Sequence, residues 1–138
     1  MSQASNYLET ALLDHVLRNT AYASPGTVYV GLFKETVDTA TTNANLEAGT
    51  LTDEITTGGY ARTLVSFSAA SSGTISNDNV VTFPAATGSY DGTVTALAVM
   101  DASTGGNPIA YGNLTVAKLV TTGDTFQIAA TNLNITLS

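Results

Sequence analysis

Residues 27–34, with the sequence TVYVGLFK, place this chain among the mainly β proteins. β-branched and aromatic residues fill the segment, as is typical of a buried strand. Similar short segments follow, separated by turns rich in Gly, Asn and Asp. We expect strands at residues 60–67, 73–76, 79–83, 93–100, 108–114, 119–121, 125–129 and 133–137. This pattern predicts a mainly β fold, an antiparallel β-sandwich of jelly-roll-like type.

The first 20 residues have a different period from the rest of the chain. Asn6 followed by Glu9 predicts a helix N-cap with an acidic partner three residues later. Apolar residues recur there at helical spacing, at Tyr7, Leu8, Ala11, Leu12, Leu13, Val16 and Leu17. We therefore predict one N-terminal amphipathic α-helix over about residues 6–19. Its apolar stripe is expected to pack on the protein's own sandwich, with docking against a neighbour as the alternative.

Residues 35–59 form a long polar insertion between two predicted strands. The insertion contains five acidic residues among Thr, Asn, Ala and Gly, and it shows no core-facing pattern. Loops of this length are uncommon inside a compact domain and tend to be functional. We expect this loop to reach a partner, and a deletion of residues 38–55 is expected to leave the fold intact.

Length and composition are those of one soluble domain covering residues 1–138. With 4 Lys and Arg against 11 Asp and Glu, the formal net charge is −7. Such a surface repels phosphate, so nucleic acid and anionic membranes are not expected partners. The chain has no Cys, which excludes disulfides and thiolate metal sites. We see neither a signal peptide nor a membrane span.

Few residues are candidates for catalysis. His15 is the only histidine, and in the predicted helix it lacks the partners that a general base requires. Asp91, Asp101 and Asp124 lie in turns, where Asp ordinarily caps its own backbone. Asp53 and Glu54 are adjacent in the insertion rather than paired across a cleft. We therefore expect no enzymatic activity and no catalytic residue.

Metal, cofactor and sugar sites are also weakly indicated. Acids at Asp38, Glu47, Asp53 and Glu54 could bind calcium, but the EF-hand spacing is absent and a solvated acidic loop is preferred. The two Gly-Gly pairs lack the Lys or the helix of a phosphate loop. We expect no metal and no cofactor. A sugar could stack only on tyrosines, namely Tyr22, Tyr60, Tyr90 and Tyr111, which are more often core or rim residues.

Several segments resemble a family of small virion structural proteins of tailed bacteriophages. The similar segments are residues 6–33, the Gly-Gly-Tyr-Ala-Arg stretch at residues 58–62, and residues 75–84, 96–107 and 123–137. The resemblance covers nearly the whole chain apart from residues 35–56. Such relatives are described as head decoration (cement) proteins, tail-fibre proteins or virion proteins of unknown role. The shared motifs are structural rather than catalytic.

The resemblance implies a β-sandwich with an N-terminal helix that assembles in many copies on the virion, within the cytoplasm of the host bacterium. We expect a capsid decoration or cement protein whose partner is the major capsid protein. The alternative is a tail, baseplate or tail-fibre component that contacts a neighbouring tail protein. A carbohydrate-binding module for host recognition is a third possibility. A homo-oligomer, either a dimer or a trimer, is expected in the structural roles.

Overall fold

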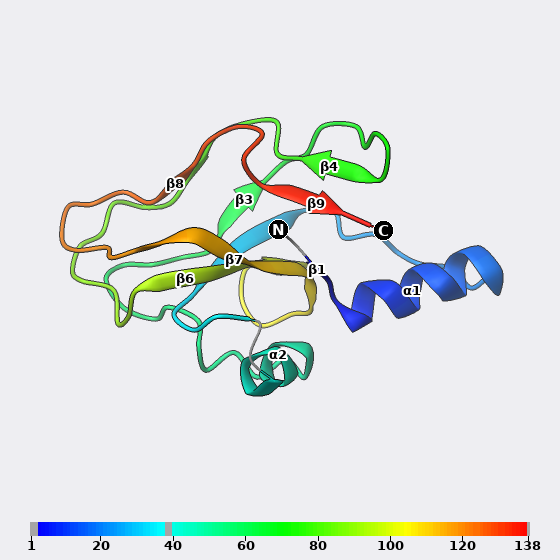
Figure 1. The fold of residues 1–138 in the computed structure, drawn as a ribbon, viewed down its shortest axis with the longest axis horizontal. Coiled ribbons are helices and arrows are strands. Elements are labelled where there is room, and N and C mark those ends of the chain that lie inside the picture. Colours follow the sequence, from blue (N-terminus) through cyan, green and yellow to red (C-terminus); the bar gives the residue numbers. More distant parts are fainter. Residues whose placement is uncertain (1–2, 38–39, 138) are drawn as a thin grey trace.

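Two apolar strands form the centre of the fold, which we describe from a computed structural model covering residues 3–37 and 40–137 (Figure 1). Strands β2 (Val28–Phe33) and β6 (Val94–Met100) pair antiparallel, with Val30 opposite Val99. They belong to a five-stranded antiparallel sheet of order β1-β7-β6-β2-β3. The remaining strands of this sheet are β1 (Gln3–Ala4), β7 (Pro108–Lys118) and β3 (Thr63–Val65).

The second layer consists of two small antiparallel sheets. One pairs β4 (Thr74–Ser76) with β9 (Asn134–Thr136), and the other pairs β5 (Val81–Thr82) with β8 (Gln127–Ile128). The mainly β, antiparallel prediction is confirmed. The jelly-roll topology is not confirmed, because the second layer is divided into two short strand pairs. The arrangement is compatible with a β-sandwich.

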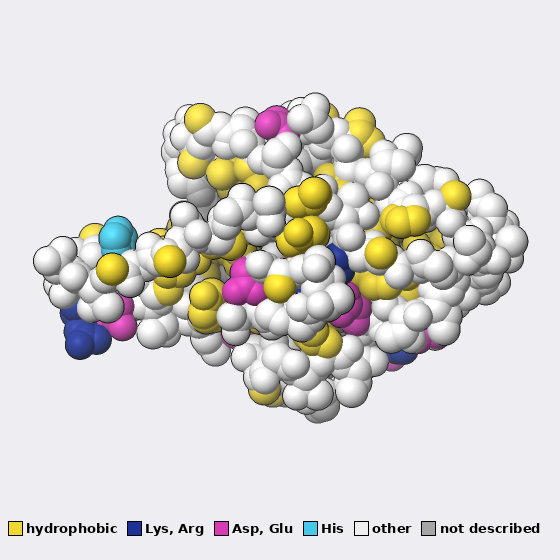
Figure 2. All heavy atoms as spheres, turned by 180° about the vertical axis from the view of Figure 1, so that it is seen from behind, with side chains coloured by type: hydrophobic (Ala, Val, Ile, Leu, Met, Phe, Trp, Pro, Cys, Tyr) yellow, Lys and Arg dark blue, Asp and Glu magenta, His cyan; other side chains and the backbone are white. Residues whose placement is uncertain are grey.

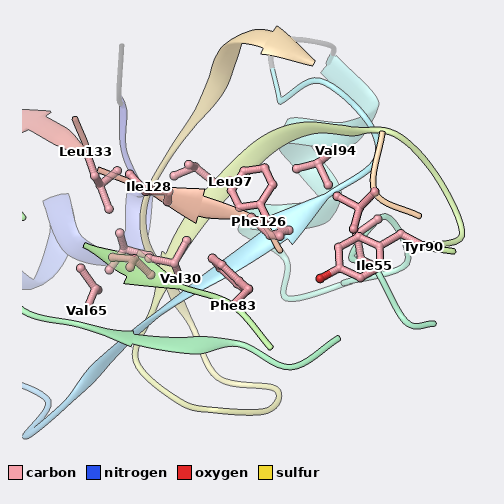
Figure 3. Packing of buried hydrophobic residues seen from close by; sticks show 14 of the residues in the cluster. Val30, Ile55, Val65, Phe83, Tyr90, Val94, Leu97, Phe126, Ile128 and Leu133 are labelled. Carbon is pink, nitrogen blue, oxygen red and sulfur yellow. The ribbon is translucent and has the colours of Figure 1, made fainter. Parts of the chain in front are cut away.

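Strand alternation directs side chains into two separate cores, because successive residues of a strand point to opposite faces. On one face, Val30 and Leu97 pack against the segments that carry β5 and β8 (Figure 3). Aromatic contacts strengthen this core, with the rings of Phe83 and Phe126 packed edge to face at 5.5 Å. On the other face, Phe33, Ala96, Ala98, Met100 and Tyr111 form a smaller core with Val37 and Leu46.

The insertion at residues 35–59 covers this smaller core, contrary to the predicted solvated loop. It contains a helix, α2 (Ala40–Glu47), and a strand-like bridge between Phe33 and Glu54. Leu46 and Ile55 are 2% and 1% exposed. This burial argues against the expectation that residues 38–55 can be deleted without loss of the fold. Sequence pattern missed α2 because a single described side chain, Leu46, anchors it.

Helix α1 (Asn6–Leu17) is present close to the predicted bounds, but its cap and its packing differ from the prediction. Ser5, not Asn6, is the N-cap, and its hydroxyl accepts a hydrogen bond from the Leu8 amide at 3.1 Å. None of the twelve helical residues is buried. At the base of the helix Leu8, Ala11 and Leu12 are half-buried, so the expectation that the apolar stripe packs on the sandwich is met in part there. It is wrong for the free end, where α1 extends from the side of the body (Figure 1).

The smaller differences concern strand ends. Residues 119–121 do not form a strand, because β7 continues to Lys118 and the chain then turns away. Strand β1 is only two residues long, too short for a sequence pattern to reveal. Within the described ranges, no helix has the length and apolar character needed to cross a membrane.

Candidate interaction surface

The free end of α1 exposes three large apolar side chains. Leu13, Val16 and Leu17 are 60%, 72% and 75% exposed. They follow the spacing i, i+3, i+4, which places side chains on one side of a helix. Figure 2 shows α1 standing out from the body, with hydrophobic atoms along it. We call these three residues the α1 tip. A group of exposed large apolar side chains on one side of a helix ordinarily marks an interaction site.

Beside the base of α1 lies an apolar groove with a volume of about 340 Å³. We call it the base groove. Strands β2, β4, β6, β7 and β9 contribute to it, and Leu8 of α1 forms part of its wall. The described residues that line it include no charged side chain; they are Leu8, Val28, Phe67, Ala70, Gly73, Thr74, Ile75, Val99, Ile109, Ile135 and Leu137.

The base of α1 is fixed to the body by hydrogen bonds. The Ser5 amide donates to the Ile109 carbonyl at 2.9 Å. The Asn6 amide donates to both carboxylate oxygens of Glu47, at 3.1 and 3.0 Å. A carboxylate at a helix N-terminus is favourable because it faces the positive end of the helix dipole. These contacts hold the helix axis in place even though the tip has no cover.

Glu47 also joins α2 to β7. The Tyr111 hydroxyl donates to Glu47 Oε1 at 2.6 Å, and it lies 3.3 Å from Asn43 Oδ1. Burial of the ring, together with the hydrogen bond to Glu47, raises the pKa of Tyr111 above its ordinary range. The hydroxyl therefore remains a donor at neutral pH. One carboxylate thus ties the insertion, the central sheet and the base of α1 together.

A buried ion pair fixes the C-terminal end of the insertion. Arg62 makes two hydrogen bonds to Glu54, Nε to Oε1 at 2.7 Å and Nη2 to Oε2 at 2.9 Å. Arg62 Nη1 donates to the carbonyls of Ala102 and Gly105. The two side chains are only 3% and 13% exposed, respectively. We call this pair the Glu54–Arg62 clamp, and because all its partners lie within the chain it is a structural element.

Tyr60 extends the clamp toward the central sheet. Its hydroxyl donates to Glu54 Oε1 at 2.8 Å and accepts from the Leu32 amide at 3.0 Å. Burial, with the nearby Glu54 carboxylate, raises the pKa of Tyr60 well above its ordinary range. Gly31 leaves room for this cluster, because a Cβ there would lie 3.2 Å from Glu54 Oε1.

The structure does not assemble the catalytic candidates. His15 is exposed, and its Nδ1 lies 3.1 Å from the Thr20 carbonyl of the following turn. Asp101 accepts from the Asn107 amide and Asp124 from the Thr121 amide, so the backbone-capping interpretation is confirmed for both. Hydrogen bonds from Thr121 lower the pKa of Asp124.

Asp91 does more than cap its own backbone, because it also has partners in other segments. The Lys34 ammonium donates to it at 2.6 Å, and the Thr56 amide donates at 2.9 Å. Desolvation alone would raise the pKa of Asp91, but the hydrogen bonds from Lys34 and Thr56 outweigh it and hold the pKa well below its usual range. Asp91 therefore joins the two ends of the insertion to the turn before β6.

The acids of the insertion do not converge on one point. Glu47 and Glu54 take part in separate networks, as described above, and Asp38 lies outside the described residues. Across residues 3–37 and 40–137 no three His, Cys, Asp or Glu side chains group as they would around a metal ion. The prediction of a solvated acidic loop is wrong for Glu54, which is largely buried.

The tyrosines are largely used in packing. Tyr60 stacks on Phe83 at 6.2 Å and meets Tyr90 edge to face at 5.9 Å. Tyr90 and Tyr111 are buried, and Tyr22 is half-buried. The core interpretation is confirmed for Tyr90 and Tyr111, so these rings are not available as a platform for sugar stacking.

Sequence reasoning named the residues of the α1 tip but placed them against the body. It did not anticipate the Glu54–Arg62 clamp or the role of Glu47. The clamp could not be found from pattern, because pairing of the two residues depends on the turn at Gly58 and Gly59. Both glycines have positive φ, and a Cβ at Gly58 would lie 2.4 Å from the Gly88 carbonyl oxygen.

One protein family matches this chain. The family is described as podophage GP4 fiber I protein gp80, and its model matches residues 3–136. No curated protein matches the chain significantly. Because the family match spans nearly the whole length, the chain belongs to the podophage GP4 fiber I protein gp80 family, a family of virion structural proteins of tailed phages.

Proposed function

We propose that this protein is a structural component of a phage tail fibre, that it acts through protein–protein contacts, and that it performs no chemistry. The observation that carries the proposal is the uncovered α1 tip on a chain of a fibre-described family. Contiguous apolar surface on a soluble protein ordinarily marks an interaction site. The tail location corresponds to the alternative from sequence, which the family description favours over the head.

The rest of the molecule supports a contact role rather than a reaction. The polar networks described above, around Glu47, Glu54 and Asp91, all have their partners within the chain. They connect the insertion to the central sheet and hold the base of α1. A rigid body with one fixed projecting helix suits a subunit that is positioned by its neighbours, because less conformational entropy is lost on binding.

Capsid decoration is the second candidate. The projecting helix favours it too, because a small domain with one attachment helix could bind between capsomers in many copies, where each contact need only be modest. Its partner would be the major capsid protein, whereas a fibre subunit would contact a neighbouring tail protein. The two candidates differ in position on the virion and not in fold.

Labelling of intact virions separates the candidates. Fab fragments raised against the purified protein would be bound to virions and located by electron microscopy, with Fab fragments against an unrelated protein as the control. We expect label at the tail fibres. Label over the whole head surface would replace the fibre proposal with the decoration candidate. Virions that carry neither label nor the protein by mass spectrometry would contradict both.

A further inference from the structure

We propose that the edge of β7 at residues 113–118, with an apolar groove beside it, binds an extended segment of a different virion protein as an added strand. A carboxylate of that segment lies against Lys118. The inference rests on the proposed contact function and names the kind of partner. It concerns a surface separate from α1, and it does not depend on where the protein is located on the virion.

The second half of β7 lacks a neighbouring strand. On one side, β1 reaches no farther along β7 than Tyr111. On the other side the register with β6 slips between Asn113 and Lys118, so that a single residue of β6, Thr95, faces four residues of β7. Residues 114–117 therefore have no partner strand on either side within the described ranges, although β7 continues through them (Figure 1). Backbone groups at such an edge can pair with an added strand.

A groove with a volume of about 640 Å³ lies beside this edge, and we call it the β7 groove. The groove opens between the two layers, because it is lined both by Leu97 of β6 and by Leu133, which precedes β9. Phe126 and Ile128, which belong to the larger core, also line it. Apolar side chains of an added strand would therefore contact the larger core and leave water.

The rim of the β7 groove carries exposed apolar side chains. Residues 115–119 are all exposed, and Val116 and Leu119 are 63% and 67% exposed. Large apolar side chains that are exposed together ordinarily mark an interaction site. A bulge and a lysine at a sheet edge can also discourage unwanted pairing. That protective role does not account for two large apolar side chains left in water at the same edge.

Charge selects an acidic segment as the occupant. Arg18, Lys34 and Arg62 each pair with a carboxylate of this chain. Lys118 is the fourth basic residue; it lines the β7 groove and forms no ion pair with any residue that the structure describes. Asp124 also lines the groove, but its carboxylate accepts two hydrogen bonds within its own turn. A carboxylate of a partner would supply the missing counter-charge of Lys118, whereas a basic segment would be repelled by it.

A second copy of this chain is a poor source of such a segment. The longest described stretch outside helices, strands and turns is residues 19–25, and it contains no Asp or Glu. Glu47, Glu54 and Asp91 are held by partners within the chain, as described above. The acidic extended segment therefore belongs to a different protein.

Two exposed valines provide a matched pair of variants. Val116→Glu places a like charge beside the incoming carboxylate, and Val80→Glu makes the same change at a position that is 53% exposed and outside the β7 groove. Circular dichroism should show that both variants fold, because neither wild-type side chain is buried. Each variant would be supplied to phage that lack their own copy of the gene. We expect roughly tenfold less Val116→Glu than Val80→Glu per virion. Equal amounts would contradict the inference.

Carbodiimide crosslinking of intact virions tests the contact at Lys118. The reagent joins an amine to a carboxylate that touches it, and mass spectrometry identifies the two linked residues. We expect Lys118 to be linked to an Asp or Glu of a different polypeptide. The link between Lys34 and Asp91, whose charged atoms lie 2.6 Å apart, is the internal control. Absence of a Lys118 link where the control link forms, or a link from Lys118 to this same chain, would overturn the inference.

The location of the protein and the state of Lys118 separate the two proposals. A protein found at the tail fibres whose Lys118 stays unlinked would keep the proposed function and remove this inference. A protein found on the head whose Lys118 is linked to a neighbouring protein would remove only the fibre location.

Discussion

Helix α1 and the insertion at residues 35–59 use their apolar residues in opposite ways. The helix carries seven apolar side chains and buries none of them. The insertion is polar, yet it buries Val37, Leu46 and Ile55 against two faces of the body. The difference teaches that a few anchored side chains, held by polar contacts such as the Glu54–Arg62 clamp, determine which segment belongs to the core. Apolar content alone does not.

The largest effect is expected from removing the insertion. Deletion of residues 38–55 takes away Leu46, Ile55 and the Glu54 partner of Arg62 together. We expect the deleted protein to lose cooperative thermal unfolding by circular dichroism, because a buried arginine would be left without its carboxylate and one face of the sheet would be uncovered. A cooperative transition near the wild-type temperature would show that the insertion is dispensable.

Breaking the clamp alone should have the next largest effect. Glu54→Ala leaves Arg62 buried without a counter-charge, which ordinarily costs about 3–5 kcal/mol in the free energy of unfolding. The matched control is Asp14→Ala, which breaks the exposed pair with Arg18 on α1 and should cost less than about 1 kcal/mol. Urea unfolding measures both. Similar losses in the two variants would remove the distinction between the regions.

Truncation of one leucine in each region compares the two directly. Leu46→Ala should lower the free energy of unfolding by about 2–5 kcal/mol, because Leu46 is buried in the smaller core. Leu17→Ala, on the exposed tip, should change the stability of the monomer by no more than about 0.5 kcal/mol. The comparison is made on the Val16→Asp background, so that contacts of the α1 tip with other molecules do not contribute. A larger loss at Leu17 than at Leu46 would reverse our account.

Acid should weaken the attachment of the insertion gradually. The pKa of Asp91 is lowered in the folded state, so its contribution to stability is complete above the unfolded pKa of about 3.9 and is lost as the pH falls through the lower folded value. Unfolding by urea at pH 7 and at pH 3 should show a smaller acid-induced loss of stability for Asp91→Asn than for the wild type. An identical loss of stability in both proteins would mean that ionisation of Asp91 does not contribute to the pH dependence of folding.

Much of the β architecture could be predicted from residue patterns. The strands at β2 and β6 are apolar and β-branched, and the structure places them at the centre of the sheet. The helix bounds were also close, because helical periodicity depends on local sequence. Strand β1 was not predictable, since two residues leave too little alternation to detect. The four strands of the second layer fall within predicted segments, but residue patterns do not show that they divide into two separate pairs.

How the segments pack against one another was harder to predict than where each helix or strand lies in the sequence. Periodicity shows which α1 residues share a face, but it does not show whether that face meets the body or another molecule. Among the described side chains of α2, Leu46 is the only buried one, and it stands among Thr, Asn and Ala, so the sequence shows no helical period there. The hydrogen bonds of Glu47 to Tyr111 and to the Asn6 amide join residues at least 41 positions apart. Only the folded chain brings them together.

Amide hydrogen exchange of α1 tests most directly whether its free end is an assembly surface. We predict that residues 10–17 exchange more slowly in the protein on intact virions than in the purified chain, while residues 43–47 of α2 exchange equally in both. The helix then owes its protection to a second molecule and α2 to its own chain. Equal exchange of residues 10–17 in the two samples would contradict the account.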